Sequence, residues 1–253
     1  MKFSANLGFL WADRPLPDAI RAAKAAGFDA VECHWPYQTP AAQVKAVLDE
    51  TGLPMLGLNT VRGNPGENGL AAVPGREADA RAAIDQAVAY AARIGAGAIH
   101  VMAGFAQGDS AHAAFLDNLR YARAEAPDDI TLLIEPLNRH DAPGYFLKTT
   151  DQARAIIEAL VLPGVRLMFD CYHVGRTEGD IVTRLRDLLP IVGHIQFASV
   201  PDRGAPDHGE VDYGFVFAQI AGLGWTRPLG AEYKPAGGAS GDLRWMRDLD
   251  SSR

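Results

Sequence analysis

Short apolar runs alternate with longer amphipathic stretches along most of the chain. An apolar run of about four to eight residues is typical of a buried parallel strand, whereas apolar residues three and four positions apart indicate a helix. On this basis the sequence predicts strands at residues 3–7, 30–33, 55–58, 98–102, 131–135, 167–170, 192–197 and 229–233. It predicts helices at residues 18–26, 40–50, 76–94, 110–126, 150–160, 180–189, 215–223 and 243–249.

This alternation predicts an α/β fold, a single (β/α)8 TIM barrel, which usually needs about 250 residues, and the chain has 253. The alternative is an open doubly wound sheet, which usually carries a glycine-rich phosphate-binding turn after its first strand. Here the first strand is followed by Gly8-Phe9-Leu10-Trp11. Because no linker or low-complexity tract interrupts the pattern, we expect one domain over residues 1–253.

The longest irregular stretch, residues 59–75, is rich in glycine and proline. Because it follows the third predicted strand, it would overhang the face of a barrel that carries active sites. Loops of this length are usually lids or binding loops. The alternative is an insertion tolerated at the surface.

Oxygen-bearing side chains lie at the ends of four consecutive predicted strands: Glu135, Asp170, Gln196 and Glu232. Catalytic groups of TIM barrels sit at the carboxyl ends of the strands, so we expect these four to converge. Three carboxylates would repel one another, and a divalent cation would neutralise them. Oxygen ligands without a thiolate favour Mg²⁺ or Mn²⁺ over Zn²⁺. The alternative is that each is a solvated residue or a helix N-cap.

Four further residues are candidates for binding a substrate at this face. His173, just past the sixth strand, could ligate a metal, orient a carboxylate or hold a substrate hydroxyl. His100 lies within the fourth strand, where a hydrogen-bonded core histidine is the alternative. Arg203, in the loop after the seventh strand, and Lys234, after the eighth, could bind a substrate carboxylate or stay solvated.

Charge and composition narrow the choice of partner. The net charge of −7 argues against nucleic acid or an anionic membrane as the main partner. No apolar run approaches the ~20 residues that a membrane helix needs, and the first residues do not resemble a signal peptide. Two cysteines, Cys33 and Cys171, are too few for a disulfide scaffold. We therefore expect a cytoplasmic protein that acts on a small molecule, and the sequence leaves its oligomeric state open.

Segments around the strand ends carry a resemblance to a known family. They are Ile134-Glu135-Pro136-Leu137-Asn138-Arg139, Phe169-Asp170-Cys171-Tyr172-His173, His194-Ile195-Gln196 and Gly230-Ala231-Glu232-Tyr233-Lys234-Pro235. Together with residues 73–77, 143–147, 176–180 and 209–213, they resemble the hydroxypyruvate isomerase family of the xylose isomerase-like barrels. The resemblance covers nearly the whole chain, and the combination of segments is specific although each alone is weak.

The resemblance implies a barrel that binds one divalent cation through Glu135, Asp170, Gln196 and Glu232. It implies that Glu135 and Glu232 act as proton donor and acceptor while hydroxypyruvate and tartronate semialdehyde interconvert through an enediolate, a reaction of glyoxylate metabolism. The chain departs from the family pattern after Arg203, where an acidic residue is usual, and at His100, where a small polar residue is expected. These departures affect the expected identity of the substrate more than the expected reaction.

Three other functions fit parts of the pattern. A sugar or keto-acid isomerase or epimerase on the same scaffold would share the enediolate. A phosphodiesterase of the abasic-site endonuclease kind would need several zinc-binding histidines and a basic surface. The chain has seven histidines in all and a net charge of −7, which argue against this function. A non-catalytic barrel that binds a small molecule would be expected to have lost metal-ligating residues, and all four candidates are present.

Overall fold

A computed structural model describes residues 1–249 and confirms the predicted TIM barrel. Eight strands form one sheet in the order β2-β1-β8-β7-β6-β5-β4-β3, and every paired ladder is parallel. The strands are β1 Phe3–Asn6, β2 Ala30–Glu32, β3 Leu58–Asn59, β4 Ala98–His100, β5 Thr131–Ile134, β6 Val165–Asp170, β7 Val192–Phe197 and β8 Leu229–Ala231. Residues 250–253 of the predicted domain lie outside the described part of the chain.

The two ends of this sheet also meet, so that the barrel is nearly closed. Val31 of β2 forms a parallel bridge with Met55, and the backbone N–H of Asn59 donates to the carbonyl of His34 at 2.8 Å. The predicted third strand at 55–58 is therefore split. Its start pairs with β2, whereas β3 itself pairs with β4, because the segment crosses from one neighbour to the other.

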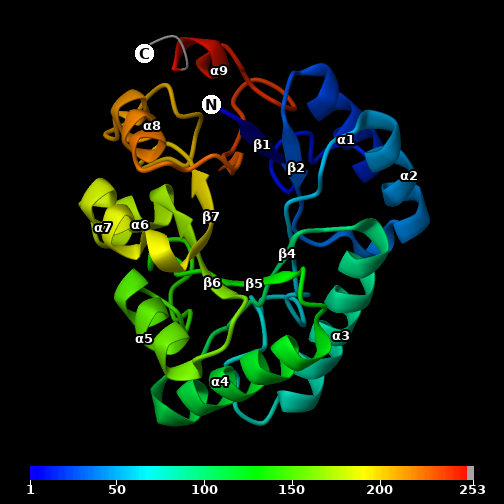
Figure 1. Cartoon of the computed structure of the whole chain (residues 1–253), viewed down its shortest axis with the longest axis vertical. Helices are drawn as coiled ribbons and strands as arrows, with labels where there is room; N and C mark the ends of the chain where they lie inside the picture. Colours follow the sequence, from blue (N-terminus) through cyan, green and yellow to red (C-terminus); the bar gives the residue numbers. More distant parts are fainter. Residues whose placement is uncertain (250–253) are drawn as a thin grey trace.

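Helices surround the strands in chain order (Figure 1). Each predicted helix is present, with its ends within two residues of the prediction. The prediction omitted the short helix α6, which starts directly where β6 ends. No helix within residues 1–249 has both the length and the apolar character needed to cross a bilayer. The helices are α1 Leu16–Ala25, α2 Ala41–Thr51, α3 Glu77–Ile94, α4 Gly108–Glu125, α5 Thr150–Leu160, α6 Cys171–Thr177, α7 Ile181–Leu188, α8 Tyr213–Gly222 and α9 Trp245–Asp248, with 3-10 turns at Pro36–Gln38 and Leu189–Ile191.

Alternation along the strands separates an apolar exterior of the barrel from a partly polar interior. Residues such as Leu132 and Phe169 belong to the main core between strands and helices. Leu133 and Met168, one position away, form a separate small apolar cluster with Ala98. Buried polar side chains occupy the carboxyl ends of several strands, namely Asn6, Glu32, His100, Asp170 and Gln196. The fold therefore gathers polar groups at the end where the sequence predicts a site.

The long loop between β3 and α3 is fastened to the segment that follows β4. Gly69 forms an antiparallel bridge with Ala103, and the N–H of Ala71 donates to the carbonyl of Met102 at 3.2 Å. Gly69 has a φ of +104°, and an added Cβ would lie 2.4 Å from the carbonyl oxygen of Met102. This close approach requires glycine.

Candidate active site

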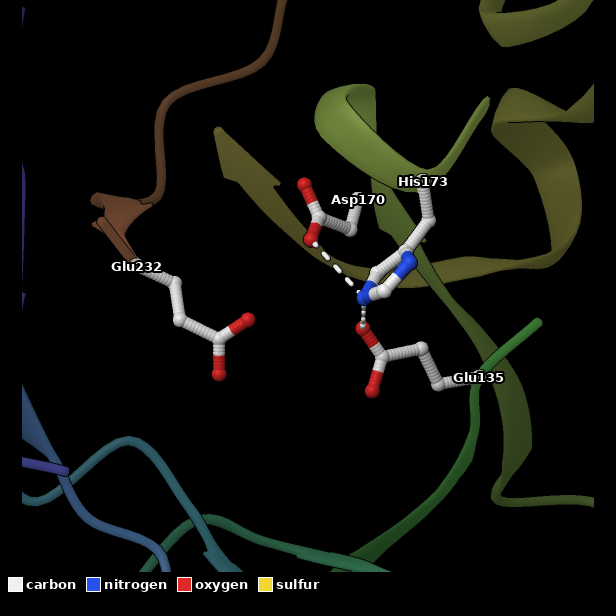
Figure 2. Close-up of side chains that lie close together, drawn as sticks. All are labelled: Glu135, Asp170, His173 and Glu232. Atoms are coloured by element: carbon white, nitrogen blue, oxygen red, sulfur yellow. Dashed lines mark ion pairs between the residues drawn. The ribbon is translucent and has the colours of Figure 1, made fainter. Parts of the chain in front are cut away.

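Glu135, Asp170, His173 and Glu232 converge at the carboxyl ends of the strands (Figure 2). Each offers a ligand atom, these atoms all lie within 4.8 Å of one another, and all four residues are buried. Asp170 is the last residue of β6, Glu135 and Glu232 directly follow β5 and β8, and His173 lies in α6. The structure thus brings together the three carboxylates that the strand ends indicated, with His173 beside them.

Asp170 both caps a helix and faces the cluster. Its Oδ1 accepts a hydrogen bond from the backbone N–H of Tyr172 at 2.8 Å, which makes Asp170 the N-cap of α6. Its Oδ2 is buried without a hydrogen-bond partner, 3.6 Å from Nε2 of His173. Burial, with the negative charge of Glu232, raises the pKa of Asp170 to about 7. The cap therefore leaves one oxygen available to a ligand.

Glu135 has the fewest partners of the three carboxylates. Its Oε1 is buried without a hydrogen bond and lies 3.9 Å from Nε2 of His173. Its Oε2 lies 3.5 Å from Nδ1 of His100. Burial raises the pKa of Glu135 well above its ordinary value, and the charges of Glu232 and Asp170 raise it further. Burial and the neighbouring negative charges thus disfavour the ionised form of this carboxyl when no cation is nearby.

Glu232, by contrast, is surrounded by donors. Its Oε1 accepts from Nδ2 of Asn6 at 3.0 Å and lies 2.9 Å from Nε2 of His34, and its Oε2 accepts from Nη2 of Arg203 at 2.6 Å. Burial alone would raise the pKa of Glu232, but the charge of Arg203 and the hydrogen bond with His34 outweigh it and hold the pKa below its ordinary value. Two glutamates in one site thus have opposite pKa shifts, an arrangement typical of acid–base pairs.

A backbone hydrogen bond fixes the tautomer of His173. The N–H of Asn138 donates to Nδ1 of His173 at 2.9 Å. Because a backbone N–H can only donate, Nδ1 carries no proton, and the neutral ring carries its proton on Nε2. Burial, followed by the charge of Arg203, lowers the pKa of His173 to about 3, so the ring is neutral near pH 7. Nε2 therefore donates toward the carboxylates and lacks the lone pair that a metal ion needs.

Gln196 is held by Glu32. Its Nε2 donates to Oε1 of Glu32 at 2.8 Å, and its own Oε1 is buried without a partner. Glu32 also accepts from Nδ2 of Asn6 at 3.0 Å and lies 2.6 Å from Nε2 of His194. Gln196 is the register partner of Asp170 across β6 and β7. Glu32 thus sets the orientation that leaves the amide oxygen of Gln196 free.

The free oxygens suit a cation. Oε1 of Glu135, Oδ2 of Asp170 and Oε1 of Gln196 are all buried without hydrogen bonds. Buried oxygens without partners are costly, and a divalent cation would satisfy them. The carboxylates of Glu135, Asp170 and Glu232, with the donor His173 beside them, could therefore hold a metal ion. Oxygen donors are the ligands that hard cations prefer.

A cavity of about 150 Å³ opens beside the cluster. Pockets for drug-sized ligands are larger, ~300–1,000 Å³, so this one suits a small molecule. The lining residues are Phe9, His34, Trp35, Asn59, Arg62, Asn68, His100, Met102, Glu135, Leu137, Asp141, Ala142, His173, Arg203 and Glu232. Among the residues expected to bind substrate, the structure thus places His100, His173 and Arg203 on this cavity.

Arg203 reaches the cavity but is already paired. Besides its bond to Glu232, its Nη1 lies 3.6 Å from Oδ2 of Asp141, and its guanidinium stacks on Phe9 and Tyr172 at 4.8 and 5.1 Å. Its backbone has a φ of +60°, uncommon for a residue other than glycine. The N–H of Lys234 donates to the carbonyl of Arg203 at 2.7 Å and helps to hold this conformation.

Neither Lys234 nor His100 is placed to bind a substrate carboxylate by its charge. The side chain of Lys234 is exposed and does not line the cavity. His100 is buried, and burial lowers its pKa to about 3, so its ring is neutral. Its two ring nitrogens have no hydrogen-bond partner. His100 can therefore offer hydrogen bonds inside the cavity, but no charge.

Other residues of the site are absent from the sequence prediction. Asn6 and Glu32 end β1 and β2. The predicted strands run one residue further, to Leu7 and Cys33, so neither polar residue stands at a predicted strand end. His34, Arg62 and Asp141 lie outside the strands, where periodicity gives no signal.

The whole chain is similar to known isomerases and to a solved barrel structure. The sequence profile of the xylose isomerase-like TIM barrel family matches residues 20–249. A 2-oxo-tetronate isomerase of Cupriavidus necator is 42% identical, covering 97% of both chains, and a putative hydroxypyruvate isomerase of Homo sapiens is 40% identical, covering 98% of this chain and 94% of its own. A solved structure described as an AP endonuclease, family 2, from Brucella melitensis superposes with a TM-score of 0.93 at 33% identity, covering 98% of both chains.

Proposed function

The chain belongs to the xylose isomerase-like TIM barrel family, as an isomerase related to hydroxypyruvate and 2-oxo-tetronate isomerases, and on this premise we propose that it isomerises a short 3-hydroxy-2-oxo acid. We take hydroxypyruvate as the substrate and tartronate semialdehyde as the product. The alternative within the same chemistry is 2-oxo-tetronate, which carries the same reacting group and one more carbon. The convergence of the buried Glu135 and Glu232 on one small cavity carries the proposal.

The proposed reaction moves two hydrogens within one molecule. A base removes a proton from C3 of hydroxypyruvate, and the electron pair of that C–H bond forms the enediolate. A proton is then delivered to C2, while the hydroxyl proton of C3 moves to the oxygen of C2. C3 is thereby oxidised to an aldehyde and C2 reduced to an alcohol, so no external oxidant or reductant is needed.

Glu135 and Glu232 would exchange the carbon-bound proton. Acid–base steps of this kind contribute typically ~10²–10⁴-fold each. His173, with its proton on Nε2, would donate to a substrate oxygen, and Arg203 would keep Glu232 ionised and in place. A divalent cation, Mg²⁺ or Mn²⁺, would be held by Glu135, Asp170, Gln196 and Glu232 and, when bound, would stabilise the developing negative charge by several kcal/mol.

The experiment is a turnover assay followed by ¹H NMR. The protein is stripped with EDTA, reloaded with Mn²⁺ or Mg²⁺, and mixed with hydroxypyruvate, 2-oxo-tetronate, dihydroxyacetone or erythrulose. We expect metal-dependent conversion of a 3-hydroxy-2-oxo acid, with the neutral ketoses converted poorly. Conversion of the ketoses alone would instead identify a sugar isomerase or epimerase.

A further inference from the structure

Arg62 is a second arginine at the cavity, and it comes from the long loop between β3 and α3. It lines the same cavity as Glu135 and Glu232, and its side chain is exposed at the rim. Asn68 of the same loop also lines the cavity. The N–H of Gly69 donates to the carbonyl of Arg62 at 2.8 Å, and Gly69 is itself bridged to Ala103. The loop that carries Arg62 is therefore fastened to the barrel.

The guanidinium of Arg62 is positioned by stacking. It lies 3.9 Å from the ring centroid of Trp35, and the indole N–H of Trp35 donates to the carbonyl of Thr60 at 3.0 Å. The ring of Trp35 in turn packs on His34, with centroids 5.0 Å apart, and Nε2 of His34 lies 2.9 Å from Oε1 of Glu232. A short series of contacts thus leads from Arg62 to the proposed reacting centre.

Within residues 1–249, Arg62 and Arg203 differ in their partners. Arg203 is bonded to Glu232, and the charges of that glutamate and its neighbours counter the effect of burial and raise the pKa of Arg203. Partial burial lowers the pKa of Arg62, and no carboxylate offsets this effect. Arg62 makes no ion pair with any of these described residues, so its donors remain available to a ligand.

The charge of the site explains why an anionic substrate needs a further cation. When ionised, the four carboxylates of Glu135, Asp141, Asp170 and Glu232 exceed by one the combined charge of Arg203 and a divalent cation, and the buried Glu32 that holds Gln196 adds a further negative charge. A substrate carboxylate would meet a net negative charge there, and such an interaction is repulsive. The guanidinium of Arg62 offsets one of these negative charges and can bind a carboxylate through two parallel hydrogen bonds.

We propose that Arg62 recognises the carboxylate of the substrate and thereby selects 2-oxo acids over neutral ketoses. This inference rests on the proposed function, because it concerns the same cavity. It assigns to Arg62 the task that the sequence had suggested for Arg203 or Lys234. Nη2 of Arg203 is engaged by Glu232, although its buried Nε has no hydrogen-bond partner within residues 1–249, and Lys234 does not line the cavity.

The test compares Arg62→Met with wild type on molecules that differ only in the carboxylate. Hydroxypyruvate is the substrate, and glycerate and glycerol are matched inhibitors in which a carboxylate replaces a hydroxymethyl group. Methionine keeps an apolar chain over Trp35 but removes the charge. We expect Arg62→Met to raise KM for hydroxypyruvate and Ki for glycerate by about tenfold or more, the loss typical of a charged hydrogen bond. Ki for glycerol and kcat should stay near wild type.

Two further variants sharpen the test. Arg62→Lys should give a smaller rise in KM, because lysine keeps the charge but not the two parallel hydrogen bonds. An unchanged KM and Ki for glycerate in Arg62→Met would overturn the inference. So would a loss of glycerate binding in Lys234→Met with none in Arg62→Met. A wild-type protein that converts no 3-hydroxy-2-oxo acid would instead refute the proposed function itself.

Discussion

The backbone N–H of Asn138 donates to Nδ1 of His173 at 2.9 Å, and this bond decides what the histidine can do. Because the proton of the neutral ring is then on Nε2, His173 faces the cluster as a donor. We therefore expect His173→Leu to leave Mn²⁺ affinity within about threefold of wild type, whereas kcat/KM falls by the ~10²–10³-fold typical of losing a donor to developing oxyanion charge. Isothermal titration calorimetry measures the affinity.

Asp170→Asn is the matched comparison for that experiment, since Asp170 lies beside His173 and offers a free oxygen. It should weaken Mn²⁺ binding at least tenfold, as expected for a lost charged ligand. Thermal melting of both variants checks that they fold. An equal loss of affinity in the two variants would show that His173 is a ligand and that its tautomer has been assigned wrongly.

The two glutamates should be needed separately. Glu135→Gln and Glu232→Gln remove a charge while nearly preserving shape, so we expect folded proteins with no measurable turnover. Glu50→Gln is a suitable control, because Glu50 lies on the surface and, within residues 1–249, its ion pair is with Arg21. Near-normal kcat in either active-site variant with metal bound would remove that glutamate from the acid–base mechanism.

Glu32 should govern metal binding without touching the metal. Its bond to Nε2 of Gln196 points the amide oxygen away from Glu32. In Glu32→Gln the amide of Gln196 can turn over, and we expect Mn²⁺ affinity to fall by about 10–100-fold, the usual effect of losing a residue that orients a ligand. The double variant Glu32→Gln with Gln196→Glu restores a donor–acceptor pair and should recover much of the affinity. If the losses of the two single variants simply add in the double, Glu32 does not orient Gln196.

Stability of the metal-free protein should depend on pH through Asp170. Its pKa is raised to about 7 in the folded protein, whereas an unfolded aspartate titrates near ~3.9. Between these values the folded state binds more protons, so the free energy of unfolding falls as pH rises through this range. In EDTA, Asp170→Asn should therefore melt several degrees above wild type at pH 8, and the gap should narrow toward pH 5. Differential scanning fluorimetry measures it, and a gap that is constant with pH would contradict the assignment.

Strand positions were the most predictable part of the molecule, because buried parallel strands form continuous apolar runs that a single sequence displays. Glu135, Asp170 and Glu232 could be found for the same reason, since each closes such a run. The short helix α6 was not predicted, because it has seven residues and begins without a turn. Asp170 is both the last residue of β6 and the N-cap of α6, so no residue separates the two elements.

The partners within the site could not be predicted, because they depend on distances between strands far apart in sequence. Arg203 and Glu232 are 29 residues apart, and the bond between them removes Arg203 as a free clamp. Arg62 lies in a loop without periodicity, and its place on the cavity and its stacking on Trp35 distinguish it from a solvated arginine. Lys234 is exposed because of the direction that the chain takes after β8, and no sequence motif predicts that direction.

We propose that this protein moves a proton between C3 and C2 of a 3-hydroxy-2-oxo acid at Glu135 and Glu232. The most direct measurement is ¹H and ²H NMR of the Mg²⁺-loaded protein with hydroxypyruvate in D₂O, against a control without protein. We expect deuterium to appear at C2 of tartronate semialdehyde and to exchange into C3 of hydroxypyruvate. Both signals should fall to the control level in Glu135→Gln and Glu232→Gln. Product formed at the full rate without deuterium at C2 would show that the C3 hydrogen is carried to C2 without exchange, by hydride transfer or by one shielded base, and would contradict separate roles for the two glutamates.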